Sequence, residues 1–145
     1  MKVTQYSEGC GALISDIQLA DLSVTQLADL RTIFAKHGLL FFRDQDFSPQ
    51  DHLQFAQRFG SIVVNKFFRA TEQFPEIAEV RKEKDQHTNI GGGWHTDHSY
   101  DDIPAMGSIL VARKLPETGG DSQFANLANA YDAHSPKLKS LIENL

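Results

Sequence analysis

Two segments in the first sixty residues place apolar side chains at the spacing of one helical face. Residues recur there at intervals of three and four: Leu27, Leu30, Ile33 and Phe34 in the first segment, and Leu53, Phe55, Ala56 and Phe59 in the second. Residues that favour helix ends flank both. Ser23 begins the first, with Gln26 at capping-box spacing, and Gly38 is placed to stop it. Ser48, followed by a proline, begins the second, and Gly60 ends it.

Short apolar runs between turn-forming residues predict the strands. We expect them at Gly11–Ile17, Leu39–Phe42, Ile77–Val80, Met106–Leu115 and Asp121–Ala125. A further strand should follow Gly93, carry His95 and Asp97, and be broken by Pro104. Pro136 to Leu145 has the pattern of a final amphipathic helix without a C-cap, so we expect a truncated chain. Two early helices followed by several short strands predict an α+β, β-rich fold. Residues 1–145 are expected to form one incomplete domain.

Composition narrows the partners of this chain. Its 145 residues carry a net charge of −5 without any lysine or arginine run, which argues against nucleic acid or an anionic membrane as a partner. A single cysteine, Cys10, excludes an intramolecular disulfide and fits a reducing compartment. With neither an apolar signal segment nor a stretch of transmembrane length, the simplest expectation is a cytoplasmic protein. Oligomeric state stays open, a homo-oligomer included.

Candidate chemistry centres on a histidine and a carboxylate separated by one residue. In an extended strand, His95 and Asp97 would project from the same face. One imidazole nitrogen and one carboxylate oxygen are two thirds of the 2-His-1-carboxylate set that holds non-heme Fe(II). A histidine merely hydrogen-bonded to Asp97 is the alternative. The flanks favour the metal reading, because the triglycine 91–93 permits close backbone approach and the expected strand is unusually polar.

Three motifs extend this pattern along the chain. They are Trp-His-Thr-Asp at 94–97, Leu-Pro-Glu-Thr-Gly-Gly-Asp-Ser at 115–122, and Gly-Leu-Leu-Phe-Phe-Arg-Asp at 38–44 with Phe59-Gly60. In this order and spacing they resemble the taurine/TfdA family of Fe(II)- and 2-oxoglutarate-dependent dioxygenases, over nearly the whole chain. The resemblance implies a double-stranded β-helix (jelly-roll) with flanking helices, whose C-terminal part is missing here.

The resemblance also implies roles for particular residues. His95 and Asp97 would be the first two iron ligands. Ser122 stands where the family commonly has a threonine whose hydroxyl contacts a cosubstrate carboxylate; a plain turn residue is the alternative. The implied reaction consumes 2-oxoglutarate and O2, releases succinate and CO2, and oxidises a C–H bond of a small anionic substrate.

Two parts of the family's site have no match. The family places a second histidine ligand and an arginine that binds 2-oxoglutarate far downstream of the first ligand pair. His98 should point to the opposite face of the strand from Asp97, and His134 precedes the final helix in an exposed loop. Arg113 follows an apolar run and matches no such arginine. We therefore expect the missing residues beyond Leu145, and no appreciable turnover by these residues alone.

Substrate contacts are expected from two short segments. Phe67, Arg69 and Tyr100 could line the mouth of the site, and Arg69 would favour anionic substrates. Ordinary surface charge and packing aromatics are the alternative. Relatives that act on taurine carry a histidine near positions 65–66 and an asparagine shortly before the tryptophan. This chain has Asn65, Lys66 and the triglycine, which argues against taurine itself.

Two rival functions differ in class from an oxygenase. His-x-Asp-His also ends a di-zinc hydrolase motif, but that motif needs a histidine at position 93, which is glycine. A non-catalytic binding fragment is the other rival, since an open jelly-roll would expose strand edges to a partner. A downstream histidine and arginine would separate the oxygenase from both.

Overall fold

The computed structural model describes residues 1–145, which form two compact units. One unit comprises residues 1–45 and 114–145, and the other residues 46–113. The elements of the first are β1 (Lys2–Gln5), β2 (Ala12–Ser15), a 3-10 turn (Leu19–Asp21), α1 (Val24–His37), β3 (Leu40–Phe42), α3 (Leu127–Asp132) and α4 (Pro136–Ile142). Those of the second are α2 (Pro49–Phe59), β4 (Arg69–Ala70) and β5 (Ala78–Glu79).

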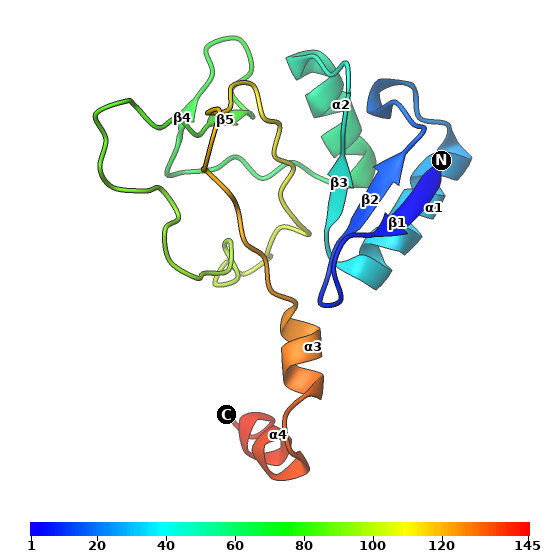
Figure 1. Ribbon diagram of the computed structural model, residues 1–145, viewed down its shortest axis with the longest axis vertical. Helices are drawn as coiled ribbons and strands as arrows, with labels where there is room; N and C mark the ends of the chain where they lie inside the picture. Colours follow the sequence, from blue (N-terminus) through cyan, green and yellow to red (C-terminus); the bar gives the residue numbers. More distant parts are fainter. The chain divides into compact units, whose positions relative to one another are not determined.

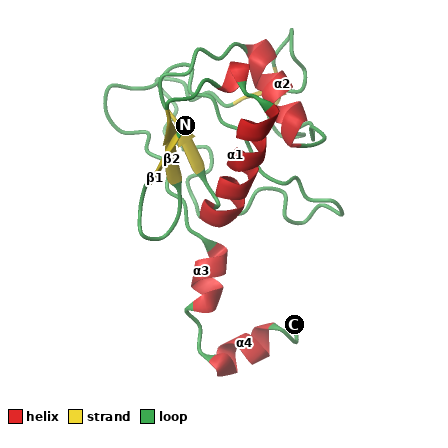
Figure 2. Cartoon of the chain, turned by 90° about the vertical axis from the view of Figure 1, so that its right-hand side faces the viewer, coloured by secondary structure: helices red, strands yellow, loops and turns green.

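A three-stranded sheet with α1 beside it forms the core of the first unit (Figures 1 and 2). β2 is central, antiparallel to β1 and parallel to β3. Ala12 and Ile14 on β2 are 0% and 1% exposed, and they alternate with half-buried neighbours. Leu30 of α1 is also fully buried. The one-sided burial of β2 explains why its residues alternate in this way.

The ends of α1 follow its capping residues. The Ser23 hydroxyl accepts from the backbone N–H of Gln26, whose side chain accepts from the N–H of Ser23. At the other end Gly38 takes φ 69°, a left-handed conformation that favours glycine. The capping box and the glycine stop expected for this helix are both confirmed.

In the second unit, α2 has a capping box of its own and an aromatic packing face. Hydrogen bonds from Ser48 to the Asp51 carboxylate hold the pKa of Asp51 below its ordinary value. Phe55, only 5% exposed, packs edge-on against Phe47 with the ring centroids 5.9 Å apart. Burial lowers the pKa of His52, whose ring lies 5.8 Å from that of Phe47. None of the helices in the chain combines the length and apolar character that crossing a membrane requires.

Strand predictions in the second half of the chain are wrong. Residues 94–97, 106–115 and 121–125 are irregular, because no neighbouring strand offers them a hydrogen-bonding ladder. Their polar groups bond locally instead, as in the Thr96–Ser99 hydroxyl pair at 2.7 Å. The strand expected at 77–80 is reduced to β5, while β1 and α3 were not expected. The early helices, the first strands and the final helix are confirmed, and so is the α+β class. The β-rich character is not: the five strands hold 15 residues, against 38 in the four α-helices.

Candidate metal and cosubstrate site

His95 and Asp97 lie side by side on an irregular segment that leads into a turn at residues 98–101. His95 Nε2 is 3.3 Å from Asp97 Oδ1, and the two side chains are 56% and 61% exposed. From the sequence, the alternation of a strand was expected to bring them together. The backbone here is irregular instead, and His98, directly after the pair, takes φ 48° where the following turn begins. The side chains nevertheless converge on one point open to solvent.

The hydrogen bond on the far side of the His95 ring decides which nitrogen is available. Nδ1 lies 2.8 Å from the carbonyl oxygen of Gly93, which can only accept, so Nδ1 carries the proton. When the ring is neutral, Nε2 then carries a lone pair and is a hydrogen-bond acceptor. It faces Asp97 Oδ1, a second acceptor. Two hydrogen-bond acceptors at this separation need a proton or a cation between them. Two ligand atoms bound to one metal ion at roughly 2.1 Å and at right angles lie about 3.0 Å apart, so the separation of Nε2 and Oδ1 fits a metal ion.

Ser108 fixes the orientation of the carboxylate. Its hydroxyl donates to Asp97 Oδ2 across 3.2 Å, which leaves Oδ1 toward His95. An outer hydrogen bond of this kind is what orients metal-binding carboxylates. Sequence reasoning missed Ser108, because it lies eleven positions from Asp97 in a segment interpreted as a strand.

Gly91 provides the surface on which the His95 ring rests. A Cβ built at Gly91 would lie 3.3 Å from Cε1 and 4.0 Å from Nε2 of His95. Gly91 also has φ +67°, whereas Gly93 has no neighbour within 4 Å and no positive φ. The close approach expected of the triglycine therefore depends on its first residue.

The donor set stops at two residues. Nowhere in residues 1–145 do three or more His, Cys, Asp or Glu side chains gather in a way that could hold a metal ion. Both ring nitrogens of His98 face other partners, Asn65 and Asp101, at 3.3 and 3.4 Å. His134 is exposed at the C-terminal end of α3. Arg113 donates to the backbone oxygen of Phe47 at 2.6 Å.

The remaining predicted site residues are divided between the two units. Phe67 and Tyr100 belong to the same unit as the His95–Asp97 pair and contact the His98 ring. Arg69 begins β4, is exposed, and lies opposite Glu79 in the β4–β5 pair. Ser122 belongs to the other unit and is exposed on an irregular segment.

Comparison with known proteins assigns the chain. Residues 2–145 match the family described as taurine catabolism dioxygenase TauD, TfdA family. The chain belongs to the TauD/TfdA family. Dioxygenases of this family use Fe(II), 2-oxoglutarate (alpha-ketoglutarate) and O2. The family assignment made from the motifs is thus confirmed.

The chain matches only part of the length of individual TauD/TfdA relatives. It is 30% identical over 138 residues to a (S)-phenoxypropionate/alpha-ketoglutarate-dioxygenase of Sphingobium herbicidovorans, covering 93% of this chain and 48% of the relative. It is 34% identical over 137 residues to an alkylsulfatase of Acinetobacter baylyi, covering 93% and 42%. A solved taurine dioxygenase from Burkholderia xenovorans matches with TM-score 0.84 and 28% identity, over 97% of this chain and 50% of that one. The chain spans about half the length of these relatives.

Removing the Ser108 hydroxyl should weaken the site without unfolding it. Ser108 is exposed, so Ser108→Ala leaves no buried group unpaired but frees the Asp97 carboxylate to rotate. We expect roughly a tenfold loss of Fe(II) affinity, the usual scale for such outer hydrogen bonds. Anaerobic Fe(II) titration of the full-length protein measures it. Ser61→Ala, an exposed serine of the same unit, is the matched control. Equal Fe(II) affinity in both variants would exclude the orienting role.

Proposed function

We propose that the protein carrying this chain is a non-heme Fe(II)- and 2-oxoglutarate-dependent dioxygenase that oxidises a C–H bond of a small anionic substrate. The observation that carries the proposal is the approach of His95 Nε2 to Asp97 Oδ1, 3.3 Å apart on an exposed irregular segment, with Nδ1 of His95 facing the Gly93 carbonyl. Membership of the TauD/TfdA family supplies the reaction class. The proposal includes the jelly-roll architecture, with residues 1–145 as part of one dioxygenase domain.

In this proposal the residues of the chain bind Fe(II) and 2-oxoglutarate and orient the ligand atoms. His95 and Asp97 bind Fe(II), the Gly93 carbonyl and Ser108 keep their donor atoms aligned, and the Ser122 hydroxyl contacts a carboxylate of 2-oxoglutarate. Bound iron supplies the oxidising power, with decarboxylation of 2-oxoglutarate to succinate and CO2. The fixed neutral tautomer of His95 keeps Nε2 free for the metal, and Asp97 contributes the negative charge that favours a divalent ion.

The site is completed by residues other than those described here. Two protein donors leave Fe(II) short of the three that the facial arrangement requires. Arg113, the one arginine after Asp97 in the sequence, donates to the backbone oxygen of Phe47. We therefore assign activity to the protein that carries this chain together with a further histidine and arginine. Residues 1–145 alone are expected to bind Fe(II) weakly and to turn over no substrate.

The proposed substrates are small organic acids other than taurine. Of the relatives named above, two act, by their names, on a phenoxypropionate and on alkyl sulfates, and the third on taurine. Against taurine stand Asn65, Lys66 and the triglycine of this chain, which differ from the residues expected in taurine-acting relatives. Phe67, Tyr100 and the exposed cation Arg69 offer apolar and charge contacts suited to such molecules. Aryloxyalkanoates, sulfonates and sulfate esters are the classes to examine.

A turnover screen tests the proposal. Full-length protein is mixed with Fe(II), 2-oxoglutarate and O2, and succinate release is measured with and without each candidate acid. We expect at least one class to stimulate succinate release, with complete loss when a chelator removes the iron. Stimulation that survives the chelator, or none with any acid despite bound Fe(II), would contradict the assignment.

A further inference from the structure

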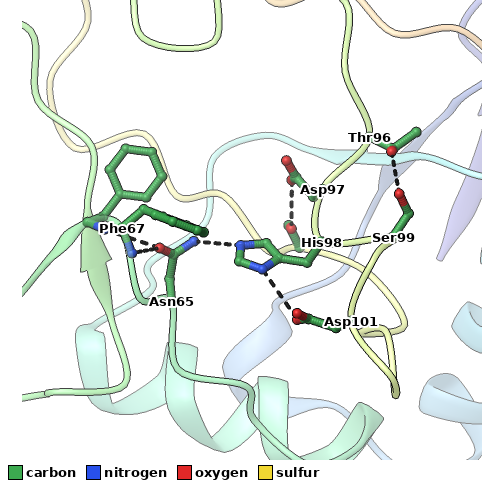
Figure 3. A network of polar contacts seen from close by, with 9 residues as sticks. Asn65, Phe67, Thr96, Asp97, His98, Ser99 and Asp101 are labelled. Atoms are coloured by element: carbon green, nitrogen blue, oxygen red, sulfur yellow. Dashed lines mark hydrogen bonds and ion pairs between the residues drawn. The ribbon is translucent and has the colours of Figure 1, made fainter.

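His98 occupies the centre of a chain of polar contacts directly after the candidate metal pair (Figure 3). Its Nε2 lies 3.3 Å from Asn65 Nδ2, and its Nδ1 lies 3.4 Å from Asp101 Oδ2. Only 20% of the His98 side chain is exposed, against 56% for His95. His98 is therefore a packed link between two segments, whereas His95 is open to a ligand.

The orientation of Asn65 determines how this link is bonded. Asn65 Oδ1 accepts the backbone N–H groups of Phe67 and Phe68, at 2.8 and 3.1 Å. The amide nitrogen must then face His98, and because it can only donate, Nε2 of His98 accepts. The remaining nitrogen, Nδ1, lies 3.4 Å from Asp101 Oδ2, within ion-pairing distance. The His98 ring thus joins Asn65 on one side to Asp101 on the other.

The exposed aromatic rings of Phe67 and Tyr100 pack against the His98 ring. The Phe67 ring centroid lies 5.6 Å from that of His98 and the Tyr100 centroid 5.7 Å, with interplanar angles of 40° and 33°. Phe67 and Tyr100 are 72% and 70% exposed. Both rings pack on His98, which directly follows Asp97 in the chain, and exposed apolar area of this kind is typical of a surface that receives a ligand.

We propose that His98 is a positioning residue which, through Asn65 and Asp101, holds Phe67 and Tyr100 beside the His95–Asp97 pair and so favours substrates with an aromatic ring. This inference rests on the proposed dioxygenase function and specifies its substrate class. His98 itself touches neither metal nor substrate. Its φ of 48° is a conformation that non-glycine residues adopt when their surroundings impose it, as they often do at functional sites.

Two substitutions break the link from opposite sides. Asn65→Leu keeps a side chain of similar size but removes both the donor to His98 and the acceptor for Phe67 and Phe68. His98→Asn tolerates the positive φ and retains a donor near Asp101, but loses Nε2 and the ring. His87→Asn, an exposed histidine of the same unit, is the control.

Binding is measured without O2, so that no turnover occurs. Calorimetry on the full-length protein with Fe(II) and 2-oxoglutarate compares phenoxyacetate with cyclohexyloxyacetate, which share an acid group and a six-membered ring but differ in aromaticity. We expect each of the two variants to raise the Kd of phenoxyacetate roughly fivefold and to change that of cyclohexyloxyacetate less than about twofold. Because both act on one link, the double variant should bind phenoxyacetate no more weakly than either single variant.

The outcomes separate the two proposals. Fe(II) affinity should stay the same in wild type, both variants and the control. A wild type that fails to bind Fe(II) overturns the dioxygenase function and the inference with it. If the wild type binds Fe(II) normally but does not bind phenoxyacetate, the role proposed for His98 is wrong while the dioxygenase function stands. The same conclusion follows if both acids lose affinity equally, or if the two substitutions have additive effects.

Discussion

Replacing His95 or Asp97 by alanine is expected to abolish substrate-stimulated succinate release by the full-length protein. Each change removes one of the two donor atoms that face each other across 3.3 Å. A site left with one protein donor from this chain should also bind Fe(II) at least about a hundredfold more weakly, since outer hydrogen bonds alone are worth 10- to 100-fold. Succinate release and anaerobic Fe(II) titration measure the two effects.

The control for this pair is His87→Ala. His87 is exposed and belongs to the same unit, so its removal changes the histidine content of that unit without touching the turn. We expect wild-type activity and Fe(II) affinity in this variant. Activity retained by either His95→Ala or Asp97→Ala, under conditions where the control is normal, would remove the basis of the ligand assignment.

Gly91→Ala should damage the same site through the backbone. The new methyl would meet the His95 ring at 3.3 Å, and φ of +67° is strained for alanine. A left-handed conformation costs roughly 1–2 kcal/mol in a residue with a Cβ. The ring must move by a few tenths of an ångström or the turn must open, so we expect about a tenfold loss of Fe(II) affinity.

Gly93→Ala is the matched comparison. Gly93 has open space around it, and its backbone carbonyl, which accepts from His95 Nδ1, is retained by alanine. We expect Fe(II) affinity within about twofold of wild type. Equal Fe(II) affinity in the two glycine variants would show that the His95 ring does not depend on the close approach at Gly91.

The parts of the fold that sequence could predict are those decided by neighbouring residues. Ser23 with Gln26, Ser48 with its proline, and Gly38 act within one helical turn, so α1 and α2 were predictable with their ends. β1 was not predictable from the sequence, because all four of its residues are exposed and show no apolar alternation. α3 is only six residues long and has no buried residue.

The candidate site was predictable in identity but not in geometry. The spacing of His95 and Asp97 and the collinear motifs indicated the pair, yet the two side chains meet on an irregular segment rather than a strand. Ser108, and the pairing of Asn65 with His98, depend on contacts between residues 11 and 33 positions apart. No local pattern encodes such contacts. Which glycine of the triglycine matters likewise depends on φ, which the sequence Gly-Gly-Gly does not reveal.

The most direct test of the central claim observes the metal–ligand bond itself. Mn(II) bound to the full-length protein in place of Fe(II) can be examined by pulsed electron paramagnetic resonance for coupling to imidazole nitrogen. Two bound histidines are predicted in the wild type, and His95→Ala should retain the coupling of only one. Nitrogen coupling unchanged by His95→Ala would show that His95 does not bind the metal and would contradict the account.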